Sequence, residues 1–407
     1  MADAAKPVPA VARLTWLDSM KGISILWIAF FHFYTSYTNN RYPDPLGANY
    51  FSSFLSRCAP SSSLGWVGCL AHGFFVALSS VGFHAVAVFL VLSGFGLTYS
   101  LAKSGNPEDG WTGWYRGRLL RLFPMYWLAH LIYLLSPFVA RSEPVDYRFV
   151  LSFLGDRVYP VDSIFYYVNP AWWYFGLLLE LYLVFPLLFR LLQKLEVVWF
   201  LIVCGAVTLL SRYVLLFVLS AHGYYIQGAF FGARLWEFAI GMVLGLLYRR
   251  SASDADQRLF SFPAIAFGIV LYVLGLYSYA NSTTYLFNDA LIGTGLFVIL
   301  AHIARWCDLL PRVGGTLAYI GAFSYGLYLV HQPYVIYFGE RMREMNEVVF
   351  TLLAWVIIAI ITCAAIPLER YVNQLTNRVL DRKKDSRQPS PVGYQPKLEA
   401  IGKMDKG

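Results

Sequence analysis

The chain has 407 residues, of which 58% are hydrophobic and only 14% are charged, and its formal net charge at pH 7 is +8. A soluble domain usually carries about 25% charged residues, so this composition excludes an ordinary arrangement of soluble domains and predicts an all-α, polytopic membrane protein. The positive charge does not point to nucleic acid as a partner, because Lys and Arg gather in the cytoplasmic loops of membrane proteins.

Ten segments are long and apolar enough to cross a membrane as helices, since a span needs about 20 mostly apolar residues. In chain order they cover residues 20–38, 72–101, 117–138, 170–192, 197–220, 229–248, 261–280, 286–305, 317–338 and 348–368. An even number of spans places both termini on one side of the membrane. Lys and Arg concentrate in the segments that share this side, so we expect both termini to be cytoplasmic and the protein to lie in the plasma (bacterial inner) membrane.

The sequence divides into three parts. Residues 1–14 are expected to form a short cytoplasmic segment, residues 15–370 a single transmembrane domain, and residues 371–407 a cytoplasmic tail that its Lys, Pro and Asp content predicts to be disordered. The first apolar run is followed by no convincing cleavage site, so we expect the first helix to stay as an anchor.

Two outer loops, residues 39–71 and 139–169, are long and suit recognition of a molecule outside the cell. Cys58 and Cys69 fall in the first loop and would be able to pair if that loop is extracytoplasmic. The five cysteines form no CxxC motif and therefore indicate neither a disulfide framework nor a zinc site.

The first polar candidate is the histidine of "KGISILWIAFFH", residues 21–32. His32 lies eleven positions after Lys21, which is about 16 Å along a helix and reaches the middle of a bilayer. A neutral imidazole there is suited to general-base catalysis. The alternative is a histidine whose hydrogen bonds only join two helices.

A second candidate is "SGFGLTYS", residues 93–100, where the small residues Ser93 and Gly94 permit close approach of another backbone or of a thin ligand. Helix packing alone explains this stretch slightly better, and spacing gives no support for Ser93 as a nucleophile served by His32. A third candidate is the pair Arg118 and Arg121, which lie three residues apart on one helix face and would clamp a phosphate. Ordinary anchoring at the cytoplasmic boundary is the alternative for the two arginines.

The fourth candidate is Glu180, about ten residues into its span and therefore at a depth similar to that of His32. A carboxylate bonded to a buried imidazole fixes the tautomer and stabilises the imidazolium. A protonated Glu bonded to a neighbouring helix is the alternative.

Weaker candidates are the expected Arg234–Glu237 ion pair and His331, a mid-span histidine with Gln332 beside it. Together the stronger candidates suggest a funnel that opens to the cytoplasm at the basic residues and ends at His32.

With these residues collected, the chain resembles the acyltransferase-3 family of integral membrane acyltransferases over residues 15–370. The similar segments, in order, are "LDSMKGISILWIAFFH", "FLVLSGFGLTYS", "RLLRLFPMY", "RLWEFAIGMVLG" and "SYGLYLVHQP". The resemblance implies an essential His32 and a donor site for cytoplasmic acyl-CoA that includes Lys21, Ser93, Gly94, Phe95, Arg118 and Arg121. It implies an extracytoplasmic carbohydrate or glycolipid acceptor, and no metal.

Three features depart from the family. Ala87 stands where an acidic residue is common, and Glu180 falls one or two residues after the usual glutamate, an offset that turns a side chain by about 100° per residue. The chain has no appended hydrolase-like domain, so we expect it to act alone or with a partner.

We therefore expect a membrane O-acyltransferase, with acetyl-CoA as the expected donor, in which His32 acts as general base or carries the acyl group itself. Glu180 is expected to assist His32. The alternative function is a transporter or flippase that moves an envelope glycan without chemistry; internal inverted repeats would favour it, and the sequence contains no evident one.

Overall fold

The computed structural model describes residues 14–385 except residues 48, 59–64, 103–104, 108, 142 and 220–222. All regular structure in this part of the chain is helical. The helices are α1 (Thr15–Thr38), α2 (Tyr50–Cys58), α3 (Gly65–Ser80), α4 (Ala85–Leu101), α5 (Gly110–Leu135), α6 (Tyr147–Phe153), α7 (Val161–Ile164), α8 (Trp173–Lys194), α9 (Val197–Tyr213), α10 (Leu235–Arg250), α11 (Ala252–Leu259), α12 (Phe262–Tyr277), α13 (Asn288–Asp308), α14 (Pro311–Ala322), α15 (Ser324–Arg341) and α16 (Glu347–Asp385). Short 3₁₀ or π turns connect several of them: η1 (Gly82–His84), η2 (Pro170–Trp172), η3 (Val214–Val218), η4 (Tyr225–Ala229), η5 (Phe231–Arg234), η6 (Ser278–Ala280) and η7 (Thr284–Phe287).

Seven stretches of the described chain are long and apolar enough to cross a membrane, or eight if the bent pair α14–α15 counts as one span. Helices α1 and α5 have 24 and 26 residues, which is sufficient length, but they carry charged side chains that lower their hydropathy. The multi-pass, all-helical architecture is therefore confirmed. The count of ten spans and the side on which the termini lie stay predictions.

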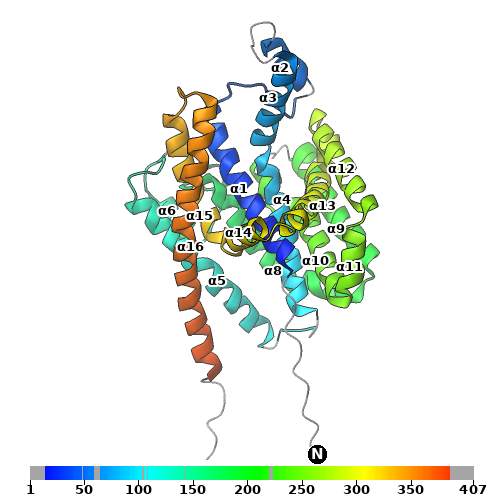
Figure 1. The fold of residues 1–407 in the computed structure, drawn as a ribbon. Coiled ribbons are helices and arrows are strands. Elements are labelled where there is room, and N and C mark those ends of the chain that lie inside the picture. The colour runs from blue at the N-terminus through cyan, green and yellow to red at the C-terminus, as the bar shows by residue number, and fades with distance from the viewer. Residues whose placement is uncertain are drawn as a thin grey trace, which may run out of the picture.

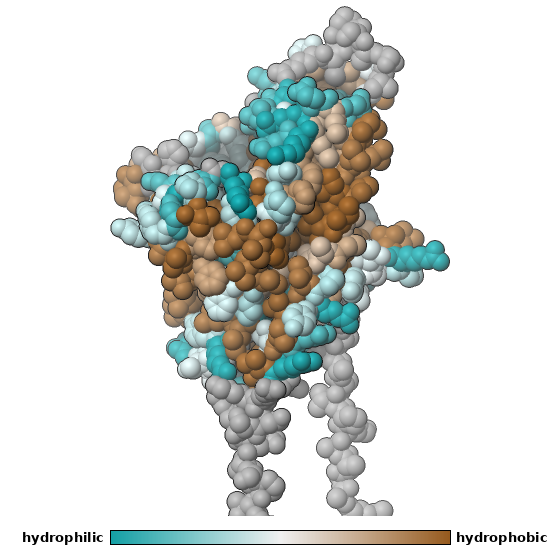
Figure 2. All heavy atoms as spheres, turned by 90° about the vertical axis from the view of Figure 1, so that its left-hand side faces the viewer, coloured by the Kyte–Doolittle hydropathy of each residue, from teal (hydrophilic) through white to brown (hydrophobic). Residues whose placement is uncertain are grey.

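The helices stand roughly side by side, with α2 and α3 projecting beyond the rest (Figure 1). Helix α1 begins in the lower half of the view and runs upward, whereas α16 runs from the top to the lower end. Figure 2 shows a largely hydrophobic band across the visible face, with hydrophilic residues above and below it. This distribution is the one that a bilayer requires, because lipid tails contact apolar side chains and the headgroup regions contact polar ones.

Three predicted spans differ from the observed helices. The span predicted over 72–101 starts earlier, at Gly65, and is interrupted at η1 before α4 begins. The span predicted over 317–338 is bent by 80° between α14 and α15. The last helix continues to Asp385, so residues 371–385, which we assigned to a disordered tail, belong to α16. Residues 386–407 and the segment before residue 14 lie outside the described chain, as does the side chain of Cys58 and therefore its predicted pairing with Cys69.

Glycines allow two helix pairs to pack at backbone distance. A Cβ atom on Gly321 of α14 would lie 1.8 Å from the carbonyl oxygen of Asp18 in α1. A Cβ atom on Gly94 of α4 would lie 2.1 Å from the carbonyl oxygen of Phe238 in α10. Small residues at such crossings are how membrane helices gain packing contacts. The first crossing holds the bent helix pair against the start of α1, and the second holds α4 in place beside the site described below.

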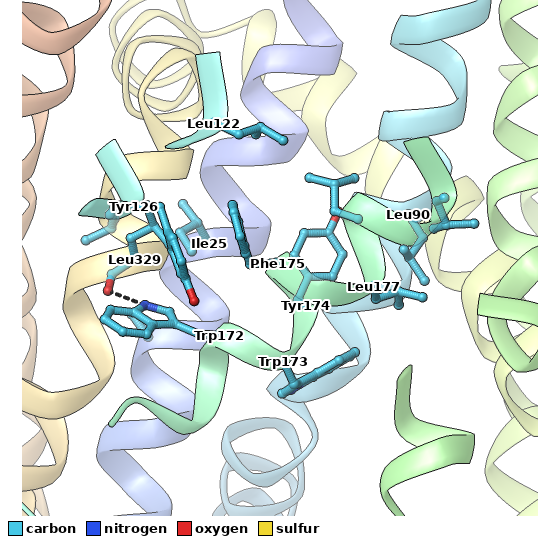
Figure 3. Close-up of a cluster of buried hydrophobic side chains, with 14 of the residues drawn as sticks. Ile25, Leu90, Leu122, Tyr126, Trp172, Trp173, Tyr174, Phe175, Leu177 and Leu329 are labelled. Carbon is cyan, nitrogen blue, oxygen red and sulfur yellow. Dashed lines mark hydrogen bonds between the residues drawn. The ribbon is translucent and has the colours of Figure 1, made fainter. Parts of the chain in front are cut away.

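Aromatic side chains at the start of α8 form much of the core (Figure 3). The indole N–H of Trp172 donates a hydrogen bond of 2.9 Å to the carbonyl oxygen of Leu329 in α15, and the ring of Phe175 stacks on that of Tyr126 in α5. The buried guanidinium of Arg157 donates a hydrogen bond of 3.0 Å to the hydroxyl oxygen of Tyr126 in α5. The long segment over residues 139–169 is thereby anchored in the core instead of lying free outside it.

Candidate active site

A cavity of about 340 Å³ brings together side chains that are far apart in the sequence. We call it the Arg118 cavity. Helix α1 contributes Lys21, Ile28 and His32, so the cavity follows this helix for eleven residues, or about 16 Å. Other helices complete the lining, chiefly with Ser93, Leu97, Arg118, Tyr174, Tyr182, Ser324, Tyr325, Tyr328 and Glu369. Two of the basic residues of the predicted funnel, Lys21 and Arg118, therefore line one cavity with His32.

His32 is the point at which this cavity meets a second one. The second cavity, of about 440 Å³, is called here the Asp289 cavity. Its lining combines aromatic with polar side chains, including Phe31, Phe83, His84, Tyr166, Gln227, Arg234, Tyr279, Tyr285, Asp289 and Gln332. Four residues line both cavities: His32, Val86, Ala171 and Trp173. The imidazole of His32 is thus accessible from two directions.

The contacts of His32 come from α15. The Nδ1 atom of His32 lies 3.1 Å from the side-chain nitrogen of Gln332. The ring of the fully buried His331 lies 5.5 Å from that of His32, centroid to centroid. Gln332 was noted in the sequence only as a neighbour of His331. Its contact with His32 depends on the packing of α15 against α1, and no pattern in the sequence reveals that packing.

The predicted partner of His32 is placed elsewhere. The carboxylate of Glu180 accepts a hydrogen bond of 2.7 Å from the backbone N–H of Phe231 and lines a third cavity with Val184, Leu215 and Tyr225. The structure does not bring Glu180 to His32, in keeping with the offset seen in the sequence. The carboxylate that does line the Arg118 cavity belongs to Glu369 of α16, a residue that sequence reasoning missed although it interrupts an apolar run.

The basic residues differ in their positions. Arg118 lines the cavity and lies over the ring of Trp114, with 5.5 Å between the guanidinium carbon and the ring centroid. Lys21 also lines the cavity and bonds to Asp18 at 3.0 Å. Arg121, in contrast, is exposed and lines neither of the two cavities that meet at His32. The predicted pair of arginines is therefore one cavity residue and one surface residue.

The residues of the Ser-Gly-Phe stretch, Ser93, Gly94 and Phe95, also differ in whether they line the Arg118 cavity. The hydroxyl oxygen of Ser93 faces the Arg118 cavity and lies 3.2 Å from the hydroxyl oxygen of Tyr174, not against His32. Gly94 is buried at the crossing with α10, and the ring of Phe95 packs against Tyr248. Gly94 and Phe95 therefore serve helix packing, and of the three residues only Ser93 is in a position to touch a ligand in this cavity.

A buried ionic network borders the Asp289 cavity. Arg234 bonds to Glu237 at 2.7 Å, as the sequence predicted, and its guanidinium also lies 3.5 Å from Asp289. Arg212 pairs with the other carboxylate oxygen of Asp289. Two cations and two anions thus balance one another, which is the condition under which charges persist in a membrane helix bundle.

Comparison with known proteins shows the family of the chain. The family model described as an acyltransferase domain, acyltransferase-3, matches residues 14–368. The chain belongs to the acyltransferase-3 family. Acyltransferase MdmB of Streptomyces mycarofaciens is 26% identical over 297 residues, which are 65% of this chain and 71% of the relative. No solved structure matches the chain.

An acyltransferase has to bring a donor and an acceptor together at one place. Among the predicted site residues of this acyltransferase-3 protein, His32 alone lines both the Arg118 cavity and the Asp289 cavity. The three other residues that line both cavities, Val86, Ala171 and Trp173, have no side chain able to exchange a proton at neutral pH.

Proposed function

We propose that the protein is a membrane O-acyltransferase that moves an acyl group from acyl-CoA to a hydroxyl group of an acceptor on the other side of the membrane. The observation that carries the proposal is the position of His32 between two cavities, one of which has Lys21 and Arg118 in its lining. Guanidinium and ammonium groups bind phosphates through charge-assisted hydrogen bonds. The Arg118 cavity is therefore the proposed donor site, with the phosphates of CoA at its basic residues.

In the simplest mechanism, the acceptor hydroxyl attacks the carbonyl carbon of the thioester. The new C–O bond forms, the C–S bond breaks, His32 takes the hydroxyl proton, and a proton from His32 passes to the sulfur of CoA. In the alternative route, His32 accepts the acyl group itself and passes it on. Release of one equivalent of CoA without any acceptor would identify the second route.

The donor is proposed to be acetyl-CoA and the acceptor a carbohydrate or glycolipid of the cell envelope. The family resemblance supports both assignments. The mixed lining of the Asp289 cavity supports the acceptor, since aromatic rings with polar groups between them suit a molecule with apolar faces and many hydroxyl groups. The proposed location is the plasma (bacterial inner) membrane, with the Arg118 cavity facing the cytoplasm.

The decisive experiment incubates the purified protein, in lipid nanodiscs, with acetyl-CoA and candidate envelope sugars. Acceptor-dependent release of free CoA thiol, together with an acylated product of the expected mass, supports the proposal. Succinyl-CoA and other short acyl donors run in parallel identify the acyl group. Absence of transfer from every donor, with transport of the same sugar in vesicles, would favour the transporter instead.

A further inference from the structure

Gln332 holds the imidazole of His32 by one specific ring nitrogen. The side-chain nitrogen of Gln332 lies 3.1 Å from His32 Nδ1, and its side-chain oxygen accepts the backbone N–H of Ala171. The Gln332 side chain is buried, so water competes little for either end. Among the described residues, Gln332 is the partner that forms a hydrogen bond with the His32 ring.

The contact with Ala171 fixes which way the amide points. A backbone N–H can only donate, so the end of the Gln332 amide that faces Ala171 has to be the oxygen. The end that faces His32 is then the NH₂ group, which also only donates. His32 Nδ1 must therefore offer a lone pair, and the neutral imidazole carries its proton on Nε2.

The neighbouring histidine, His331, is compatible with this tautomer of His32. His331 Nδ1 lies 3.0 Å and 2.9 Å from the carbonyl oxygens of Leu327 and Tyr328, so it carries the proton of that ring. Its Nε2 atom is buried and has no partner among the described residues. His331 thus presents a lone pair at Nε2, and it supplies no N–H that would compete with Gln332 for His32 Nδ1.

We propose that Gln332 is a positioning residue that sets His32 in the tautomer with a lone pair at Nδ1 and a proton at Nε2. The inference rests on the proposed function, in which His32 exchanges protons. Gln332 lines the Asp289 cavity and not the Arg118 cavity, whereas His32 lines both. The Nδ1 edge of the ring therefore lies toward the proposed acceptor side.

In this tautomer the two ring nitrogens have separate tasks. As the acceptor hydroxyl attacks the thioester, Nδ1 takes the hydroxyl proton in place of the hydrogen bond from Gln332. As the C–S bond breaks, Nε2 gives its proton to the sulfur of CoA. The ring starts and ends neutral, with one proton gained and one lost. It is left with the proton on Nδ1, where it faces the NH₂ group of Gln332, and exchange with water in the cavity restores the first tautomer.

The test reads the tautomer directly and needs no substrate. The protein is labelled with ¹⁵N-histidine and placed in lipid nanodiscs, and the signals of His32 are identified by their loss in His32→Asn. We expect the wild-type proton on Nε2. Gln332→Glu replaces the donor by a carboxylate acceptor and is expected to move the proton to Nδ1, whereas Gln332→Leu is expected to give a mixture. Gln227→Leu is the matched control for the tautomer measurement alone, because Gln227 lines the same cavity but bonds to Tyr166.

A wild-type proton on Nδ1, or a tautomer that neither Gln332 variant changes, would overturn the inference. Acyl transfer is measured on the same samples. Gln332→Glu is expected to lower kcat about 100-fold or more with little change in the KM for acyl-CoA, the effect of losing one acid–base group. An altered tautomer with an unchanged kcat would overturn the positioning role. If the tautomers are as expected but the wild-type protein transfers no acyl group, the proposed function fails while the tautomer assignment stands.

Discussion

The carboxylate of Glu369 in α16 accepts a hydrogen bond of 2.7 Å from the backbone N–H of Gly326, the third residue of α15. The first N–H groups of a helix have no partner within the helix. Here they follow the 80° bend between α14 and α15, and the partner of the Gly326 N–H comes from α16. A buried side chain from another helix thus caps the helix that carries Gln332 and closes one wall of the Arg118 cavity.

Replacing Glu369 is therefore expected to loosen the bend. Glu369→Ala should lower the free energy of unfolding by about 1–2 kcal/mol, the usual value of an N-terminal cap, whereas Glu369→Gln keeps an acceptor oxygen and should lose less. Thermal unfolding in detergent, followed by tryptophan fluorescence, measures the difference. Glu340→Ala, at a half-exposed ion pair, is the control and should change little. Equal losses in the Ala and Gln variants of Glu369 would contradict the capping role.

Removal of the imidazole is expected to abolish transfer. His32→Ala should lower kcat by a factor of about 100 to 10,000, the range for a general acid–base group, while the protein still inserts and elutes as the wild type does. Release of CoA thiol is the measurement. Activity within a few-fold of wild type would remove His32 from the mechanism.

The two arginines are expected to differ. Arg118→Ala should raise the Kd for acyl-CoA about 10-fold or more, because a hydrogen bond to a charged group contributes about 1.5–3 kcal/mol. Arg121→Ala removes a charge from the surface and should have a much smaller effect. Isothermal titration of the two variants with a non-hydrolysable acyl-CoA analogue compares them. A larger loss at Arg121 would mean that the phosphates lie outside the Arg118 cavity.

The network beside the Asp289 cavity is expected to be essential for stability. Asp289→Asn leaves the buried Arg212 and Arg234 without their shared anion and should cost about 3–5 kcal/mol. The expected observation is a strongly reduced yield of folded protein and a lower thermal midpoint. Glu340→Gln, which neutralises one member of an exposed pair with Arg343, is the control. Wild-type stability of Asp289→Asn would show that the two arginines find other partners.

A substitution at the crossing of α4 and α10 distinguishes a packing role of Gly94 from a ligand-binding role. Gly94→Ala places a Cβ atom against the backbone of Phe238 and should destabilise the protein by about 1–3 kcal/mol, as overpacking does. Gly117→Ala, in a helix with open space around the site, should be neutral or stabilise by about 0.5–1 kcal/mol. Chemical unfolding of both variants in detergent provides the comparison. A stable Gly94→Ala protein that has lost only acyl-CoA binding would restore the ligand role of Gly94.

Composition and apolar runs were sufficient to predict the class of fold, because the cost of unpaired backbone groups in lipid permits few architectures. They also made His32 a candidate, since an ionisable group deep in an apolar helix is expensive and rare. Arg118 became a candidate together with Arg121, because the two arginines share one helix face at the predicted boundary. Both residues can be recognised as candidates from the sequence immediately around them.

The remaining features depend on how helices approach one another. The pairing of His32 with Gln332 joins residues 300 positions apart, and no local pattern encodes it. Glu180 and Glu369 both follow apolar residues in their helices, and only the packing of α16 against α15 shows which of them reaches the Arg118 cavity. The bend at Phe323 was hidden because both halves of the segment are apolar and helical.

The wall that the two cavities share has a further consequence. It consists of His32, Val86, Ala171 and Trp173. If each cavity admits water from its own side of the membrane, these four side chains also separate two electrolytes at different potentials. In the proposed mechanism, the protein would then have to act as an electrical insulator at the place where His32 exchanges protons. A smaller residue at Val86 or Trp173 would then be harmful to the cell through ion leakage, even if acyl transfer itself continued.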